Sequence, residues 1–421
     1  LINEYRISPD SQIRTQLRLA DYQRSYWAKT PNLMLAPDAL GAVGGNQTRT
    51  SSYQTVTLQS DLNTKFQLLG FKHELLTGIE YLHEDSYRKA LNNYGNVAAP
   101  DYRPYQEALT GNPISFTSNS YAIYAQDSVE FIPKWKLTAG VRRDEMSANY
   151  SSITSPNLRY GENSYRSSLS YHPADDSHYY LSYSSSFSPT ADLYQLTVVP
   201  QPPETSEVVE LGAKLLLMGG DLALRAALYQ ATKHWERNAD LEAVATILTQ
   251  KRRTNGIELE ATGRINDRWE IFAGLSLMNA KILEVAQNIS PITGDMIFAN
   301  PEYAGKTARN SPPYTVNVWT HYQLTSHWKI GGGIEAKGER QAFNPSSAGV
   351  VPTLNGVYHP NTAPAYARWD AMIAYEQKQW VARMNIKNLF DHLYYDALYD
   401  NGSFTVPSSR RMIILTVEYK L

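Results

Sequence analysis

Aromatic and arginine side chains gather in the stretches that separate the chain's alternating segments. These residues are Arg88, Tyr94, Tyr102, Arg103, Tyr105, Tyr194, Trp235, Arg237, Arg340, Phe343, Tyr394, Tyr395 and Tyr399. Aromatic faces stack on planar rings, and arginine offsets negative charge and adds cation–π contacts. This set predicts a binding site for an aromatic, anionic small molecule. The alternative is that the tyrosines serve loop packing or an aromatic belt at a membrane interface, where tyrosine is enriched.

Motifs of enzymes and of metal sites are absent from the sequence. There is no Gly-x-Ser-x-Gly elbow, no His-Glu-x-x-His pair and no cysteine nucleophile. The glycine-rich stretch at 41–50, GAVGGNQTRT, lacks the Lys-Ser/Thr of a phosphate-binding loop, so we interpret it as a flexible connection. The histidines are scattered without the spacing of metal ligands. The sequence therefore predicts neither an enzyme nor a resident metal or cofactor.

The composition limits the class of protein that presents these side chains. The 421 residues are 42% hydrophobic, and a net charge of -2 provides no basic surface for nucleic acid. Cysteine is absent, and no run of about 18 apolar residues is available for a membrane helix. Tyrosine outnumbers phenylalanine by 30 to 10. These features fit a protein of the bacterial cell envelope.

The C-terminal stretch shows the element that repeats along the chain. Its apolar alternate residues are Ile413, Leu415, Val417, Tyr419 and Leu421. The residues between them include Thr416, Glu418 and Lys420. A period of two predicts a strand with one apolar and one polar face.

About 17 segments of this kind follow one another, and helical periodicity is scarce. In the segment 379–387 the apolar set is Trp380, Ala382, Met384 and Ile386, and the opposite face carries Gln379, Arg383, Asn385 and Lys387. Such a polar face is too charged for a dry core, yet the apolar face continues from segment to segment. Lipid outside and a polar lumen inside satisfy both faces. We therefore predict an all-β fold, a transmembrane antiparallel β-barrel. The triplet at 331–333, Gly-Gly-Gly, predicts a bend or a close backbone approach within a strand.

The connections between these segments alternate between short and long. The short ones lie at 8–11, 67–70, 132–135, 172–177, 218–221, 265–268, 324–327 and 376–379. The long ones are expected near 23–47, 85–117, 151–160, 188–204, 237–250, 286–311, 341–363 and 391–407. Outer-membrane barrels have short periplasmic turns and long extracellular loops. Sandwiches and propellers mix their loop lengths, so the alternation favours the barrel.

Several segments resemble those of TonB-dependent outer-membrane receptors. They are PPETSEVVELGAKLLLMGGDLALRAALYQ at 202–230, the Gly-Ile-Glu-Leu-Glu strand and its hairpin at 251–282, RNSPPYTVNVW at 309–319, and NLFDHLYYDALY at 388–399 with the terminal strand after it. The resemblance extends from about residue 120 to the end of the chain. Within the family, SFSPTADLYQL, YARWDAMIAYE and NLFDHLYYDALYDNG are most similar to receptors for ferric catecholate siderophores.

The resemblance implies a barrel of about 22 strands, of which this chain would hold about the last 17. Residues 1–421 would then be the C-terminal part of the transmembrane barrel, without the first strands and the N-terminal plug domain. The implied function is uptake of ferric siderophores across the outer membrane of Gram-negative bacteria. The implied partners are the ferric siderophore, the TonB–ExbB–ExbD complex through a missing N-terminal segment, and outer-membrane lipid and lipopolysaccharide. Such receptors usually end on Phe, whereas this chain ends on Leu421.

Other functions remain open at this point. The same fold could carry haem, cobalamin or an oligosaccharide, although 298–312 does not match the segment usual in haem receptors of the family. A passive porin-like channel or an adhesin barrel would have the same strand pattern without a plug. A soluble enzyme is the remaining alternative, and the missing motifs argue against it.

Overall fold

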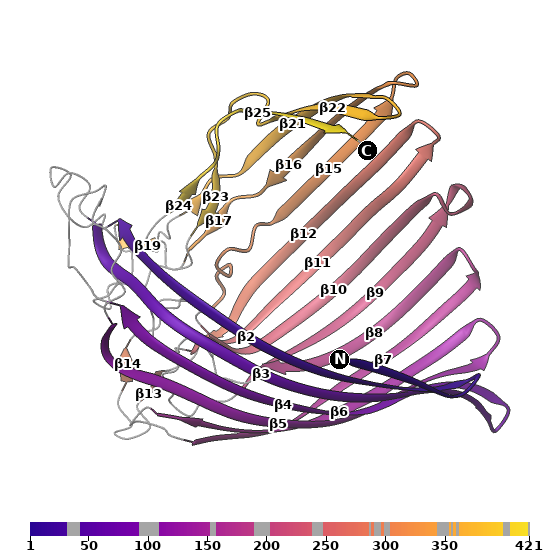
Figure 1. The fold of residues 1–421 in the computed structure, drawn as a ribbon, viewed down its shortest axis with the longest axis vertical. Helices are drawn as coiled ribbons and strands as arrows, with labels where there is room; N and C mark the ends of the chain where they lie inside the picture. The colour runs from indigo at the N-terminus through magenta and orange to yellow at the C-terminus, as the bar shows by residue number, and fades with distance from the viewer. Residues whose placement is uncertain are drawn as a thin grey trace. The chain divides into compact units, whose positions relative to one another are not determined.

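The computed structural model describes residues 1–31, 43–91, 109–151, 157–188, 203–237, 247–285, 288–289, 296–298, 304–342, 353–354, 357–358, 362–398 and 405–419. Seventeen long strands form a single antiparallel sheet, as predicted (Figure 1). They are β1 (Ile2–Ser8), β2 (Ser11–Pro31), β3 (Val43–Leu68), β4 (Phe71–Leu91), β5 (Leu109–Ile132), β6 (Trp135–Tyr150), β7 (Asn157–Ala174), β8 (Ser177–Ser188), β9 (Glu204–Leu217), β10 (Leu222–Arg237), β11 (Ile247–Asn266), β12 (Trp269–Val285), β15 (Tyr314–Gln323), β16 (Trp328–Lys337), β21 (Tyr366–Glu376), β22 (Trp380–Lys387) and β25 (Met412–Tyr419).

The remaining strands are short and form two-stranded sheets within the long connections. They are β13 (Asn288–Ile289), β14 (Met296–Phe298), β17 (Arg340–Gln341), β18 (Thr353–Leu354), β19 (Val357–Tyr358), β20 (Thr362–Ala363), β23 (Tyr395–Leu398) and β24 (Thr405–Pro407). In the part of the chain that the structure describes, the helical element is one 3₁₀ turn, η1 (Met218–Gly220). Among the described residues no helix has the length and apolarity needed to cross a membrane.

The chain divides into two compact units. The first contains Leu1–Leu169, Tyr183–Glu207 and Lys233–Gln250, and the second contains Ser170–Ser182, Val208–Thr232 and Lys251–Leu421. In the first unit β1 to β6 pair in chain order. In the second unit β12, β15, β16, β21, β22 and β25 pair in succession (Figure 1).

The strand register confirms the predicted apolar face at the C-terminus. Leu415 pairs with Met384, which in turn pairs with Ile373. Leu415 is 70% exposed and its alternate neighbours Ile413 and Val417 are similarly open. An apolar face left uncovered in this way is the surface that a transmembrane sheet presents to lipid.

The opposite face of each unit is charged, as predicted. In the first unit Arg142 pairs with Glu80 at 3.1 Å and with Asp144 at 2.8 Å. In the second unit Arg383 lies 3.7 Å from Glu418. Charged groups that pair along the strands need water or polar partners on that side. The two faces therefore meet different surroundings.

Short and long connections alternate as expected, but the first two long connections are shorter than predicted. Strands β2 and β3 stay paired from Ser11 and Thr64 to Pro31 and Val43, and β4 and β5 stay paired to Leu91 and Leu109. These extensions lack a regular alternation of apolar and polar residues, so periodicity does not reveal them. Backbone pairing continues along them, with a hydroxyl contact between Ser25 and Thr50 at 2.8 Å.

Large rings on the polar faces lie over glycines of the neighbouring strand. Trp319 lies against Gly331 and Gly333, where an added Cβ on Gly333 would meet the indole Cε3 at 2.6 Å and would also collide with a backbone oxygen. Tyr124 lies over Gly78 in the same manner and donates a hydrogen bond across it to Asp61. The glycine triplet thus marks a close approach, as the sequence predicts.

Substituting Gly333 with alanine should lower the free energy of unfolding by about 1–3 kcal/mol, the usual cost of overpacking. The new methyl group must displace the indole of Trp319 or the Val318 carbonyl. Gly332→Ala is the matched control, because its Cβ would have a nearest atom at 3.6 Å. Urea unfolding of the two variants in detergent measures the difference. Equal destabilisation at both positions would contradict the packing argument.

Candidate functional site

A hollow of about 510 Å³ opens on the polar side of the second unit. Its lining residues are Glu260, Thr262, Phe272, Ala273, Gly274, Asn317, Val318, Trp319, Gly333, Ile334, Glu335, Arg368 and Asp370. Because these residues come from β11, β12, β15, β16 and β21, the sheet itself positions the site. A concave surface with aromatic walls and a few convergent polar groups is the usual form of a small-molecule site.

The strand register places the side chains of the hollow in two adjacent rows. In one row Phe272 pairs with Trp319, Trp319 with Gly333, and Gly333 with Asp370. In the other row Asn317 pairs with Glu335. Gly333 has no side chain, and the indole of Trp319 occupies the space above it. Phe272, on the other side of Trp319, is 45% exposed. The row therefore places two aromatic side chains along the hollow.

Arg368 organises the charged end of the hollow. Its guanidinium lies 2.9 Å from Glu335 and donates to both carboxylate oxygens of Asp370 at 2.9 and 3.1 Å. It also donates to the hydroxyl of Tyr394 at 3.1 Å. Tyr366 donates to the second oxygen of Glu335 at 2.7 Å. All of these groups are held in one geometry before any ligand arrives.

The hollow carries more acidic than basic groups. Glu260, Glu335 and Asp370 line it together with a single guanidinium, that of Arg368. Arg225 lies 3.5 Å from Glu260, and both of these side chains are more than half exposed. The arrangement can stack on rings and exchange hydrogen bonds, which is the chemistry of binding. Within the described ranges no cluster of three or more histidine and carboxylate groups is arranged to hold a metal ion.

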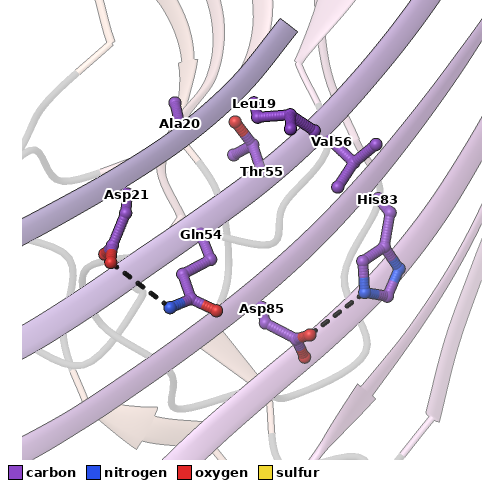
Figure 2. A pocket seen from close by; sticks show the side chains of 8 residues that line it. All are labelled: Leu19, Ala20, Asp21, Gln54, Thr55, Val56, His83 and Asp85. Carbon is purple, nitrogen blue, oxygen red and sulfur yellow. Dashed lines mark hydrogen bonds and ion pairs between the residues drawn. The ribbon is translucent and has the colours of Figure 1, made fainter.

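A second hollow, of about 420 Å³, lies on β2, β3 and β4 of the first unit (Figure 2). Its apolar residues Leu19 and Val56 share a face with Tyr81 and Tyr121, whose rings are 5.1 Å apart. Beside them Asp21 accepts a hydrogen bond from Gln54, and His83 pairs with Asp85 at 3.0 Å (Figure 2). This hollow therefore marks where the apolar face gives way to polar residues.

Three of the sequence-predicted site residues come together beside the first hollow. Arg340 is 5% exposed and donates to the carbonyl of Tyr395 at 2.6 Å. Tyr394 is 5% exposed and stacks on Tyr366 with ring centroids 4.2 Å apart. These side chains contact the protein in this conformation. Their contact with a ligand stays a prediction.

The other predicted residues belong to the first unit or lie outside the described ranges. Arg88, on β4, is half-buried, and Trp235, on β10, has a positive φ of 56°. Arg237 is the last residue of β10. The predictions for Tyr94, Tyr102, Arg103, Tyr105, Tyr194, Phe343 and Tyr399 lie outside the described residues.

Comparison with known proteins assigns the chain to a family. Residues 3–389 match the family model described as TonB dependent receptor-like, beta-barrel. The chain belongs to this family. Its β-barrel receptors are located in the outer membrane of Gram-negative bacteria, and so is this chain.

Among curated proteins the chain is similar to siderophore receptors. It is 24% identical to the probable TonB-dependent siderophore receptor PiuA of Acinetobacter baumannii, over 87% of this chain and 52% of that protein. It is 25% identical to the ferrioxamine receptor of Yersinia enterocolitica, over 88% and 51%. It is 22% identical to the catecholate siderophore receptor Fiu of Escherichia coli K12, again over 88% and 51%.

The solved structures show the same fold. The crystal structure of PiuA aligns with 99% of this chain at a TM-score of 0.80, with 21% identity, and 63% of that chain is covered. The present chain thus spans about half the length of the curated relatives it matches. The fold shared with PiuA is that of the TonB-dependent β-barrel.

The family-like C-terminal segment has a structural explanation in this receptor chain. Asn388 follows β22 with a φ of 52°, is 2% exposed, and donates to the carbonyls of His392 at 2.8 Å and Ser409 at 3.1 Å. Asp391 accepts from Arg410 at 2.7 Å. Each residue joins the start of the connection 388–411 to its end. Asn388 and Asp391 thus form a clasp that closes this connection.

The clasp should resist mild acid and open only at low pH. The hydrogen bonds from Arg410 and from the backbone of Arg411 hold the pKa of Asp391 well below its ordinary value. A lowered pKa stabilises the folded form above the unfolded value of about 3.9, and this stabilisation is lost as pH falls further. Hydrogen exchange of residues 389–411 should therefore be constant from neutral pH to about pH 5, after correction for intrinsic rates, and rise below pH 4. The pH response should be absent in Asp391→Asn.

Sequence reasoning missed the residues that form the hollow. Phe272, Trp319, Glu335 and Arg368 lie within strands, whereas the residues predicted from the sequence lie mostly in or beside the long connections. The available signal was a glycine triplet in one strand beside a tryptophan in the preceding one. Without the register, nothing showed that Trp319 faces Gly333.

Proposed function

We propose that this chain is the barrel part of an outer-membrane receptor that takes up ferric siderophores. The observation that carries the proposal is family membership together with relatives that are named as siderophore receptors. The polar hollow supports it, because exposed aromatic faces fixed by the sheet suit a ring-bearing organic ligand. The long connections then face outwards and the short turns face the periplasm.

The proposal extends to parts that this chain does not contain. The relatives are about twice as long, which supports a complete barrel of about 22 strands with an N-terminal plug domain. In that protein residues 1–421 supply the C-terminal part of the barrel. Energy for transport comes from TonB with ExbB and ExbD. Outer-membrane lipid and lipopolysaccharide surround the apolar face.

The preferred cargo in this proposal is a ferric catecholate. The catecholate receptor Fiu is among the relatives, and the predicted arginines Arg88, Arg103 and Arg237 would offset an anionic complex. A cargo that is neutral or cationic is the second candidate. It is favoured by the excess of carboxylates in the hollow, and a ferrioxamine receptor is also among the relatives.

Tryptophan fluorescence of the full-length receptor in detergent tests this proposal. We expect saturable quenching by a ferric catecholate after inner-filter correction, weakened in Arg103→Ala and reduced in amplitude in Trp319→Phe. Quenching by a ferric hydroxamate alone would replace the cargo with the second candidate. Quenching by neither would overturn the siderophore proposal and leave haem, cobalamin, an oligosaccharide or a passive pore.

A further inference from the structure

Three long connections are joined to one another at one end of the second unit. They follow β12, β16 and β22, and the described parts that contain the contacts are 304–313, 338–342 with 362–365, and 388–398 with 405–411. Asn310 donates from its backbone to the carbonyl of Gln341 at 2.9 Å and from its side chain to that of Leu398 at 3.0 Å. Gln341 donates to the carbonyl of Thr307 at 2.7 Å. Each of the three connections thus has at least one hydrogen bond to another of the three.

Arg340 lies at the centre of this junction. Its backbone belongs to β17, which pairs with β20 through Ala363. Its guanidinium reaches the third connection and donates to the carbonyls of Tyr395 at 2.6 Å and Asp396 at 3.0 Å. Two donors of a planar fork on two successive carbonyls is a geometry that arginine supplies and lysine does not.

A cluster of buried apolar residues lies beside these polar contacts. Ala342, Ala363 and Leu398 are each at most 5% exposed and form one cluster, against which Tyr395 packs. These residues come from both sides of the connection after β16 and from the connection after β22. Burial of this kind keeps segments together without depending on one hydrogen bond.

The connection after β12 is also attached to its own strand. Ala308 donates to the carbonyl of Ala280 at 3.1 Å, and Ile282 donates to that of Lys306 at 3.0 Å. Ala280, Ile282 and Ala308 form a second buried cluster. The chain of contacts therefore extends from the β12 backbone through Asn310 and Arg340 to Tyr395. We name the described parts of the three connections, taken together, the platform.

The platform touches the hollow through one hydrogen bond and one ring stack. Tyr394 belongs to the platform, and its hydroxyl accepts from Arg368, which lines the hollow. Its ring stacks on Tyr366, which donates to Glu335 of the hollow. The side chains that line the hollow and those that hold the connections are thus in direct contact.

We propose that Arg340 is a positioning residue. It joins the connections after β16 and β22 directly, and with Asn310 and Gln341, which attach the connection after β12, it holds the platform preformed beside the hollow. The inference rests on the proposed function for its ligand, and it assigns Arg340 to the platform instead of to cargo contact. A platform that is ordered before binding removes the entropic cost of ordering it during binding. When only a fraction of the molecules has the platform assembled, the apparent affinity for the ligand is multiplied by that fraction.

Hydrogen exchange of the full-length receptor without cargo tests the platform. We expect Arg340→Met to raise exchange at least tenfold in 304–311, 362–363 and 394–398, with β15, β16 and β21 unchanged. Arg410→Met is the matched control. Arg410 bonds within its own connection and is largely exposed, so this variant should affect only 388–411. If Arg340→Met raised hydrogen exchange only in 394–398, the three connections would not behave as one unit, and the proposal would be overturned.

Ferric siderophore binding then tests the positioning role. If the unaltered receptor binds, Arg340→Met should weaken affinity at least fivefold, mainly through a slower association rate, and Arg340→Lys should restore little. Unchanged affinity in Arg340→Met, despite raised exchange in all three connections, would overturn the positioning role. If the unaltered receptor binds no ferric siderophore, the proposed function fails. In that case the hydrogen-exchange result without cargo still shows whether the platform exists.

Discussion

Replacing Leu415 with arginine should destabilise the folded receptor in a bilayer by about 2–4 kcal/mol, the cost of a cation on the lipid face near the midplane. Leu415 is 70% exposed and lies in a row with Met384 and Ile373, so an arginine there would stand beside apolar side chains on the paired strands. Urea titration of folding into lipid vesicles measures the loss.

Ile414→Arg is the matched control for this prediction. Ile414 is the neighbouring large apolar residue, is 37% exposed, and pairs with Asn385 on the polar face. Arginine there should change the folding free energy by about 0.5 kcal/mol or less, as surface substitutions usually do. Thr416, which pairs with Arg383, shares that face. Equal losses at Leu415 and Ile414 would refute the assignment of the two faces.

Removing the guanidinium of Arg368 should cost about 3 kcal/mol of unfolding free energy, because two carboxylates lose their shared partner. Arg368 and Asp370 are 22% and 19% exposed at their side chains, so water screens the remaining charges only in part. Arg368→Met keeps most of the side-chain volume while removing the charge. Urea unfolding in detergent at pH 7 gives the difference.

Neutralising the two carboxylates separates the charge effect from packing. In the triple variant Arg368→Met, Glu335→Gln, Asp370→Asn, most of the loss should be recovered, because no unpaired charge remains in the site. Arg225→Met provides a comparison, since Arg225 is 64% exposed and its pair with Glu260 contributes little. A triple variant as unstable as Arg368→Met would show that the guanidinium acts through packing.

The sheet could be predicted from the sequence almost completely. Ile413, Leu415 and Val417 alternate with polar residues, and this pattern needs only the local geometry of a strand. The same holds for the short turns, such as 67–70 and 376–379, which lie where hydrophobic alternation stops. The extension of β2 to Pro31 was not predictable in this way, because its residues do not alternate regularly and the backbone pairing with β3 was not visible in the sequence.

The contacts of individual side chains depended on the tertiary structure. Arg340 looks like a free loop cation in the sequence, but the fold turns its guanidinium onto the carbonyls of Tyr395 and Asp396. Similarly, Trp319 and Gly333 become neighbours only because β15 and β16 adopt one register.

About 17 two-faced strands, joined by alternating short and long connections, follow from the residue pattern alone, and the motifs indicate the receptor family. Which strand residues form the hollow, and which loop residues hold the platform, emerges from the folded chain. Face alternation is a local property with a period of two. Register and loop contacts instead depend on residues far apart in the chain, such as Asn310 and Leu398, which are 88 positions apart.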